Sequence, residues 1–303
     1  MIESIGEEAF NFQDERFADI QMLRYRLPDF ESLTIRQKQL IYCLSEATLF
    51  GRDITFDQFG KYNLRIRKTL EAVYLNFNGD RLEHNFRALE EYLKHVWFAS
   101  GIYHHYACDK FSPLFSEDFF RNEVLAIDSK LLPLNDGESV TSLLNELCPV
   151  IFDPTILPKR VDKSDGKDIV RSSACNYYDG VYQHEVEEFY TKLKKDGPTN
   201  EAPSYGLNST LVKEGDSIRE DVWKIDGKYG AAIEKIVYWL NRAKDFVEND
   251  QQLHVINLLI RYYETGDLHD FDIYSIEWLR EQEGRIDFIN GFIEVYGDHL
   301  SLT

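Results

Sequence analysis

The sequence predicts an α+β fold that is predominantly α-helical with a smaller β component. Apolar residues recur at helical spacing through most of the first 200 residues and again after residue 230. Two short β-type runs flank Glu214-Gly215-Asp216, and one alternating run lies at residues 286–296. A chain of 303 residues can bury roughly three-quarters of its unfolded surface. These observations together indicate a packed protein in which helices form most of the core.

Three amphipathic helices are predicted in the first hundred residues. Thr34 and Gln37 have the spacing of a capping box ahead of the first, which carries apolar residues from Leu40 onward. The second runs from about residue 66 to the turn residues at 78–80, and the third from about residue 86 to Gly101. Because each has one apolar face, we expect the three to pack as a bundle.

The middle of the chain is predicted to be less regular, and the last third returns to helix. Shorter helices are expected at 119–127 and 142–147, polar loops at 153–158 and 162–168, and a helix at 179–195. Runs 207–213 and 218–225 predict a β-hairpin. Three helices are expected within residues 230–248, 251–264 and 271–281. Gly197, Pro198 and Pro203 mark a linker, so we divide the chain into a helical region, 1–200, and a region of hairpin, helices and terminal strand, 201–303.

Composition excludes several classes of partner. The formal net charge of −19 argues against DNA or RNA, because phosphate binding depends on clustered Lys and Arg. Four cysteines have neither metal-type nor disulfide-framework spacing, so free thiols and a reducing compartment are favoured. The acidic first thirty residues hold no signal-length apolar run, and no segment is long enough to span a membrane. The sequence therefore predicts a cytoplasmic protein, and leaves a periplasmic one open if a signal was removed.

The common catalytic motifs are absent. Nucleotide-binding glycine loops and a G-x-S-x-G nucleophile elbow are not found. His104-His105-x-x-Cys108 has no fourth ligand at a suitable spacing, and His184-Glu185 lacks the second His of a zinc-binding helix. The acids of residues 267–272 are expected to cap a helix that begins near Phe271. We therefore predict no metal site and no catalytic residue within this chain.

The alternating run at 286–296 is the best candidate for a binding site. Alternation puts Asn290, Glu294 and Tyr296 on one face of a strand and Asp287 on the other. An amide, a carboxylate and a phenol make a poor core, but they suit a groove that holds a peptide by its polar ends. Asp287 would share that groove only if a bulge or bend turned it to the same face.

Several runs of the sequence resemble one family of enzymes. Gly291-Phe-Ile-Glu-x-Tyr-x-Asp298 is similar to a run in dipeptidyl peptidase III, a zinc exopeptidase family that removes dipeptides from peptide N-termini. The resemblance to its bacterial, Bacteroides-type branch extends over further runs, at residues 17–25, 60–67, 109–111, 173–180 and 232–239. One departure is His299, where the family usually has Pro.

This resemblance implies a fold and a function. It implies the lower, substrate-binding lobe of such an enzyme, with Asp287, Asn290, Glu294 and Tyr296 holding the free amino group and backbone of a peptide substrate. The family's zinc motif lies downstream of the Tyr-x-Asp run and has no counterpart here. We therefore expect one incomplete lobe that is inactive alone and lacks a C-terminal catalytic lobe carrying the zinc. The alternative is a non-catalytic helical scaffold or peptide-binding protein.

Overall fold

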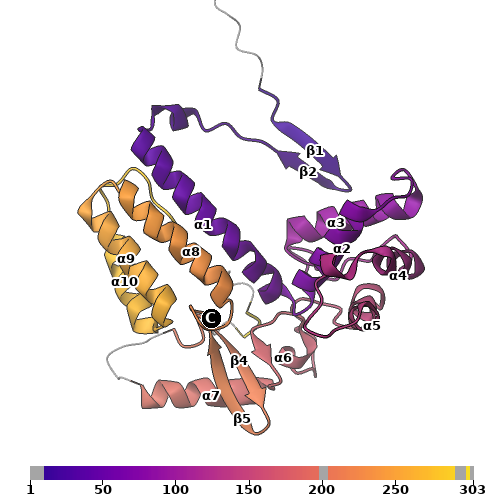
Figure 1. The fold of residues 1–303 in the computed structure, drawn as a ribbon. Helices are drawn as coiled ribbons and strands as arrows, with labels where there is room; N and C mark the ends of the chain where they lie inside the picture. Colours follow the sequence, from indigo (N-terminus) through magenta and orange to yellow (C-terminus); the bar gives the residue numbers. More distant parts are fainter. Residues whose placement is uncertain (1–9, 198–203, 291–297, 301–303) are drawn as a thin grey trace, which may run out of the picture. The chain divides into compact units, whose positions relative to one another are not determined.

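The computed structural model describes residues 10–197, 204–290 and 298–300, and it divides the chain into two compact units, Met1–Thr34 and Ile35–Thr303 (Figure 1). The chain is 54% helical with 10% strand, which confirms a mixed α+β fold dominated by helix. The unit boundary at residue 34 is not the one that we predicted near residue 200. Because residues 198–203 lie outside the described part, the division at residue 200 stays a prediction.

The first unit contains a small antiparallel sheet. Strands β1 (Gln13–Phe17) and β2 (Ile20–Leu23) pair across a turn in which Ala18 has a φ of 46°, and the short helix η1 (Pro28–Ser32) follows. No residue of either strand is buried. The sequence analysis missed this hairpin because strands with no buried face carry no apolar alternation. The expectation of an entirely helical first half is wrong at this point.

In the second unit, the first core includes one face of a long helix. Helix α1 (Ile35–Phe59) packs along α8 (Gly230–Ala243), which is followed by η3 (Lys244–Phe246), α9 (Asp250–Thr265) and α10 (Leu268–Arg280) (Figure 1). Leu40, Cys43 and Ala47 of α1 are buried in one cluster with residues of α8 and α9. The expected bundle of the first three helices is therefore wrong for most of α1, because its apolar stripe is covered by helices from the far end of the sequence.

The second core lies between shorter helices. Helices α2 (Asn63–Asn76), α3 (His84–Ala99), α4 (Glu117–Ala126) and α5 (Val140–Phe152), with η2 (Ser129–Leu131), enclose a separate apolar cluster. Buried Asn63 joins the ends of α2 and α3, since its Oδ1 accepts a hydrogen bond from the Ile102 amide at 3.3 Å. A Cβ at Gly101, where φ is 156°, would lie 2.1 Å from the Asn63 amide nitrogen, so only glycine fits.

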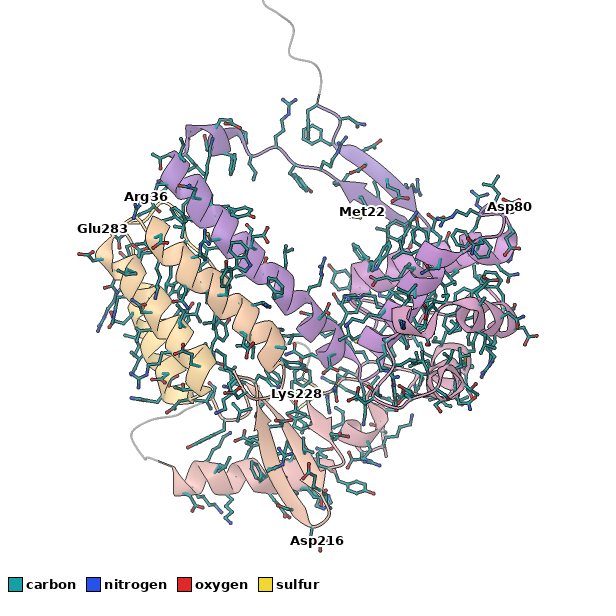
Figure 2. The ribbon with its side chains drawn as sticks, in the orientation of Figure 1. Met22, Arg36, Asp80, Asp216, Lys228 and Glu283 are labelled. Atoms are coloured by element: carbon teal, nitrogen blue, oxygen red, sulfur yellow. The ribbon has the colours of Figure 1, made fainter. Side chains whose placement is uncertain are left out.

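A three-stranded sheet packs on the first core, where its Tyr178 and Leu211 side chains are buried. Strand β3 (Tyr178–Asp179) is parallel to β4 (Ser209–Glu214), which pairs antiparallel with β5 (Ser217–Val222), and the short helix α6 (Ile169–Ser172) and α7 (Gln183–Asp196) flank β3 in the chain. This confirms the predicted hairpin, whose tip carries Gly215 at a φ of 61° and Asp216 (Figure 2).

The predicted terminal strand is wrong over residues 286–290, which form no strand pairing. The rest of that prediction, including Glu294 and Tyr296, lies outside the described residues. Within the described ranges, none of the helices combines the length and the apolar character that a membrane span requires.

Candidate functional site

The chain that leads into the predicted peptide-binding segment is fixed at Ile286. Gln252 donates a hydrogen bond from its Nε2 to the Ile286 carbonyl at 2.8 Å, and the Ile286 amide donates to Glu248 Oε1, also at 2.8 Å. Gln252 is itself buried in the first turn of α9. Because both backbone groups of Ile286 are satisfied by side chains, this point of the chain is held in place without a sheet.

Beyond Ile286, the two described site candidates contact different helices. Asp287 is exposed, and its Oδ1 accepts hydrogen bonds from Trp278 Nε1 of α10 at 2.9 Å and from the Phe288 amide at 2.7 Å. Asn290 Oδ1 instead accepts a hydrogen bond from the Tyr263 hydroxyl of α9. The structure therefore does not bring Asp287 and Asn290 together, in agreement with the opposite faces that alternation gave them.

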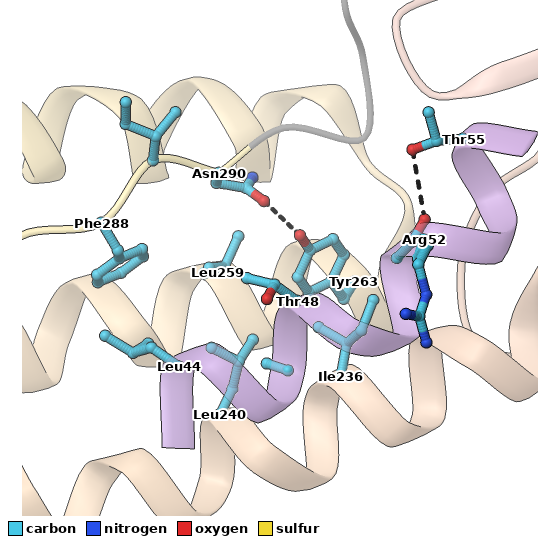
Figure 3. A pocket seen from close by; sticks show the side chains of 13 residues that line it. Leu44, Thr48, Arg52, Thr55, Ile236, Leu240, Leu259, Tyr263, Phe288 and Asn290 are labelled. Atoms are coloured by element: carbon cyan, nitrogen blue, oxygen red, sulfur yellow. Dashed lines mark hydrogen bonds between the residues drawn. The ribbon is translucent and has the colours of Figure 1, made fainter. Parts of the chain in front are cut away.

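Asn290 lines a cavity of about 260 Å³ between α1, α8, α9 and residues 288–290 (Figure 3). Its walls are mainly apolar, from Leu44 of α1, Leu240 of α8 and Phe288. Burial raises the pKa of the Tyr263 phenol well above its ordinary value, so the hydroxyl stays protonated and donates to Asn290. With its oxygen engaged in this way, the Asn290 amide nitrogen has no hydrogen-bond partner among the described residues.

The chain is anchored again at Asp298 and His299, which are 4% and 5% exposed. Asp298 Oδ2 accepts a hydrogen bond from the Tyr178 hydroxyl of β3 at 3.1 Å, and its Oδ1 accepts one from the Leu300 amide. His299 Nδ1 lies 2.7 Å from Cys175 Sγ, and its ring meets the Tyr178 ring edge to face. The sequence analysis noted His299 only as a departure from the family pattern and missed this cluster.

Burial governs the protonation of this cluster. It lowers the pKa of His299 to about 4, against the opposing influence of Asp298 and Asp168. It also raises the pKa of the Cys175 thiol and, together with the Asp298 charge, the pKa of the Tyr178 phenol. At neutral pH, a neutral imidazole, thiol and phenol therefore surround one carboxylate. This arrangement is suited to holding the chain and not to nucleophilic catalysis, which needs a thiolate.

A second polar cluster lies where α1 ends and the β4–β5 hairpin begins, near Lys228 (Figure 2). Asp57 Oδ2 accepts hydrogen bonds from the Tyr229 hydroxyl at 2.5 Å and from Asn176 Nδ2 at 2.9 Å, and it lies 3.5 Å from Lys228 Nζ. Burial lowers the pKa of Lys228, although Asp57 acts in the opposite direction. Lys228 also donates to Thr210 of β4 at 2.9 Å. Asp57 thus joins three segments that are distant in sequence.

The described residues hold no group of three or more His, Cys, Asp or Glu side chains that could bind a metal ion. His104 Nδ1 accepts hydrogen bonds from the amides of Tyr106 and Ala107 and is therefore occupied. Asp267 caps α10 by accepting from the His269 amide at 2.8 Å, which confirms the predicted capping role. All four cysteines are free thiols, as predicted. The donor set that zinc requires is thus not present in the part of the chain that the structure describes.

Comparison with known proteins finds similarity to one family. The family model described as Peptidase family M49 matches residues 175–302. A curated relative, dipeptidyl peptidase 3 of Nematostella vectensis, is 22% identical over 244 residues, which are 71% of this chain and 33% of the relative. The chain is therefore similar to the dipeptidyl peptidase III family. The match of residues 175–302 includes all four predicted site residues and also the Cys175–His299 and Tyr178–Asp298 pairs.

The fold is similar to that of one solved structure of dipeptidyl peptidase III. The enzyme from Caldithrix abyssi superimposes with a TM-score of 0.56 at 17% identity, over 90% of this chain and 38% of that one. The enzyme from Corallococcus sp. strain EGB has a TM-score of 0.49 at 14% identity, over 84% of this chain and 35% of that one. The chain spans about a third of the length of these relatives. Dipeptidyl peptidase III enzymes are zinc-dependent as a family.

Proposed function

We propose that this chain forms the substrate-binding lobe of a zinc-dependent dipeptidyl peptidase that releases dipeptides from peptide N-termini. The observation that carries the proposal is the anchoring of the chain on both sides of the Gly-Phe-Ile-Glu-x-Tyr run. Ile286 and Asn290 are held by α9 and the residues just before it, and Asp298 and His299 are held by residues 175–178. A segment tied at both ends loses less conformational entropy when it binds a peptide.

The residue types of this segment fit the recognition of a peptide N-terminus. The Glu294 carboxylate would receive charge-assisted hydrogen bonds from the protonated α-amine of the substrate. Asn290 would donate to a peptide carbonyl, because Tyr263 engages its oxygen and its amide nitrogen has no hydrogen-bond partner among the described residues. Tyr296 would add a phenolic hydroxyl. Asp287 accepts a hydrogen bond from Trp278 of α10, so it would contact the peptide only if the peptide also passes α10.

The proposal gives zinc and the residues of this chain separate roles in the reaction. When bound in the complete enzyme, zinc would supply the activated water that attacks the peptide bond. The residues of this chain would bind the free amine, orient the backbone and so set the distance from the N-terminus to the cleaved bond. Selection for a charged amine makes an exopeptidase, because an internal peptide bond has no such charge to offer.

The test compares a peptide that has a free N-terminus with the same peptide N-acetylated. We expect the free-amine peptide to bind more tightly by roughly ten- to a hundredfold, since a hydrogen bond to a charged group contributes about 1.5–3 kcal/mol. Glu294→Ala should remove this preference, and Asn290→Ala should weaken both peptides equally. Glu187→Ala, on the exposed face of α7, is the matched control and should change neither affinity.

Titration calorimetry on the folded chain, with circular dichroism to check each variant, measures these affinities. Equal binding of the two peptides by the unmodified chain would contradict recognition of the amine. Failure to bind either peptide would instead favour the non-catalytic scaffold. In a complete enzyme, the same Glu294→Ala change should lower kcat/KM for free-amine substrates by a similar factor while leaving the zinc content intact.

A further inference from the structure

The cavity between α1, α8, α9 and residues 288–290 has an apolar floor and a mouth that carries polar side chains (Figure 3). Buried apolar residues of three helices form the floor: Ala47 of α1, Leu240 of α8 and Leu259 of α9. The exposed lining residues are Thr48, Arg52 and Ile289, so the mouth lies beside them. A cavity of this kind fits a ligand that has an apolar body and one polar end.

Gly51 leaves this cavity open. It lies in the interior of α1, where glycine is less favourable than alanine because it loses more backbone freedom. No close approach requires glycine here, since a Cβ at this position would meet no neighbouring side chain and no other segment within 4 Å. Gly51 lines the cavity, so a larger side chain would occupy it. The glycine therefore lowers the stability of the helix and preserves the volume of the cavity.

Arg52 is the one charged residue among those that line the cavity. Its guanidinium forms no hydrogen bond or ion pair with any described residue, in a chain whose 53 acidic side chains outnumber its 34 basic ones. The carboxylate next to it in the sequence, Asp53, lies 2.9 Å from Arg67 Nη1. A guanidinium can hold a carboxylate by two parallel hydrogen bonds, so an anionic end group fits the mouth of this cavity.

From these observations we propose that the cavity binds an amphiphilic monocarboxylate, with its apolar chain on the floor and its carboxylate at Arg52. An apolar cavity of about 150 Å³ holds benzene, so about 260 Å³ leaves room for an unbranched chain of roughly eight carbons. The ligand class is therefore that of a free medium-chain fatty acid. A cationic amphiphile would bring a like charge to Arg52. This inference rests on α1, α8 and α9 and does not depend on peptide binding.

Titration calorimetry on the folded chain with sodium octanoate tests the binding. We expect one site per chain, and the affinity should fall roughly three- to fourfold for each methylene removed from the ligand. The gain should stop once the chain is longer than the cavity, so dodecanoate should bind no more tightly than decanoate. Absence of octanoate binding, or an affinity that rises through dodecanoate without a limit, would overturn the proposal.

Filling the cavity tests the location of the site. Gly51→Leu should weaken octanoate binding roughly tenfold or more, because the leucine side chain takes the place of the ligand chain. Leucine favours helix, so the urea midpoint of this variant should not fall, and unfolding would not explain the loss of binding. Ser45→Leu adds the same side chain to the exposed surface of α1 outside the cavity and should leave the affinity unchanged. Unchanged octanoate affinity in Gly51→Leu would overturn the assigned site.

The end group of the ligand tests the role of Arg52. The unmodified chain should bind octanoate roughly three- to tenfold more tightly than octan-1-ol, and octylamine, which is cationic at pH 7, more weakly than either. Arg52→Met should abolish the preference for octanoate over octan-1-ol, and Arg52→Glu should bind octylamine more tightly than octanoate. Arg87→Met, on the exposed surface of α3, is the matched control and should keep the preference. The same preference in Arg52→Met as in the unmodified chain would overturn the carboxylate assignment.

Discussion

Protonation of His299 should destabilise this protein between pH 7 and pH 5. The imidazole is 5% exposed, its buried Nε2 has no hydrogen-bond partner among the described residues, and burial lowers its pKa to about 4. The charged groups around it act in both directions, since Asp298 and Asp168 favour the protonated form and Lys163 disfavours it. Burial, with Lys163 acting in the same direction, outweighs the two carboxylates, so the folded protein holds His299 neutral.

The sign and size follow from linkage. The folded-state pKa lies below the unfolded value of about 6.5, so the unfolded chain binds the proton more tightly, and stability falls as pH drops from about 6.5 toward 4. At pH 7 both states are mostly neutral. At pH 5 the unfolded chain is almost fully protonated and the folded one is not, which costs about 2 kcal/mol of stability.

Urea unfolding at pH 7 and pH 5 measures this loss, and variants separate it from the titration of other groups. His299→Gln removes the titrating group, so its free energy of unfolding should fall by about 2 kcal/mol less than that of the unmodified chain over this interval. His254→Gln, on the exposed surface of α9, is the control and should lose as much as the unmodified chain. An equal loss for His299→Gln and the unmodified chain would refute the reasoning.

Four further outcomes are expected. Tyr178→Phe removes the hydroxyl that donates to buried Asp298 and should lower the free energy of unfolding by about 1–3 kcal/mol; no change in the urea midpoint would contradict the proposed anchor. Asp57→Ala leaves the Tyr229 hydroxyl without its acceptor and Lys228 without its ion-pair partner, and should cost about 3 kcal/mol. Asp179→Ala breaks only the exposed pair with Lys61 and should cost less than about 1 kcal/mol, so similar losses for the two changes would contradict the assigned burial. The chain by itself should hold no stoichiometric zinc and cleave no dipeptidyl-arylamide, which elemental analysis and a fluorogenic assay check; one tightly bound zinc per chain would overturn this expectation.

Local sequence was enough to predict most helices and the β4–β5 hairpin. The interactions that decide these elements lie within a few residues, as in the Asp267 cap of α10 and the turn at Gly215. Resemblance in longer runs was enough to predict the similarity to dipeptidyl peptidase III, because a run such as residues 173–180 constrains many positions at once. The exposed β1–β2 hairpin was missed, since strands without a buried face leave no periodic signal.

Tertiary structure alone decided which side chains meet. Asp57 and Tyr229 are 172 residues apart in the sequence, and Cys175 and His299 are 124 apart, yet each pair is in hydrogen-bond contact. Alternation placed Asp287 and Asn290 on opposite faces. Only the packing of the helices showed that Asp287 contacts Trp278 of α10 and that Asn290 contacts Tyr263 of α9. A single sequence records the chemistry of each residue and its near neighbours. The pairing of distant polar groups depends on how the helices pack, because burial removes water and makes each such group take the partner that packing provides.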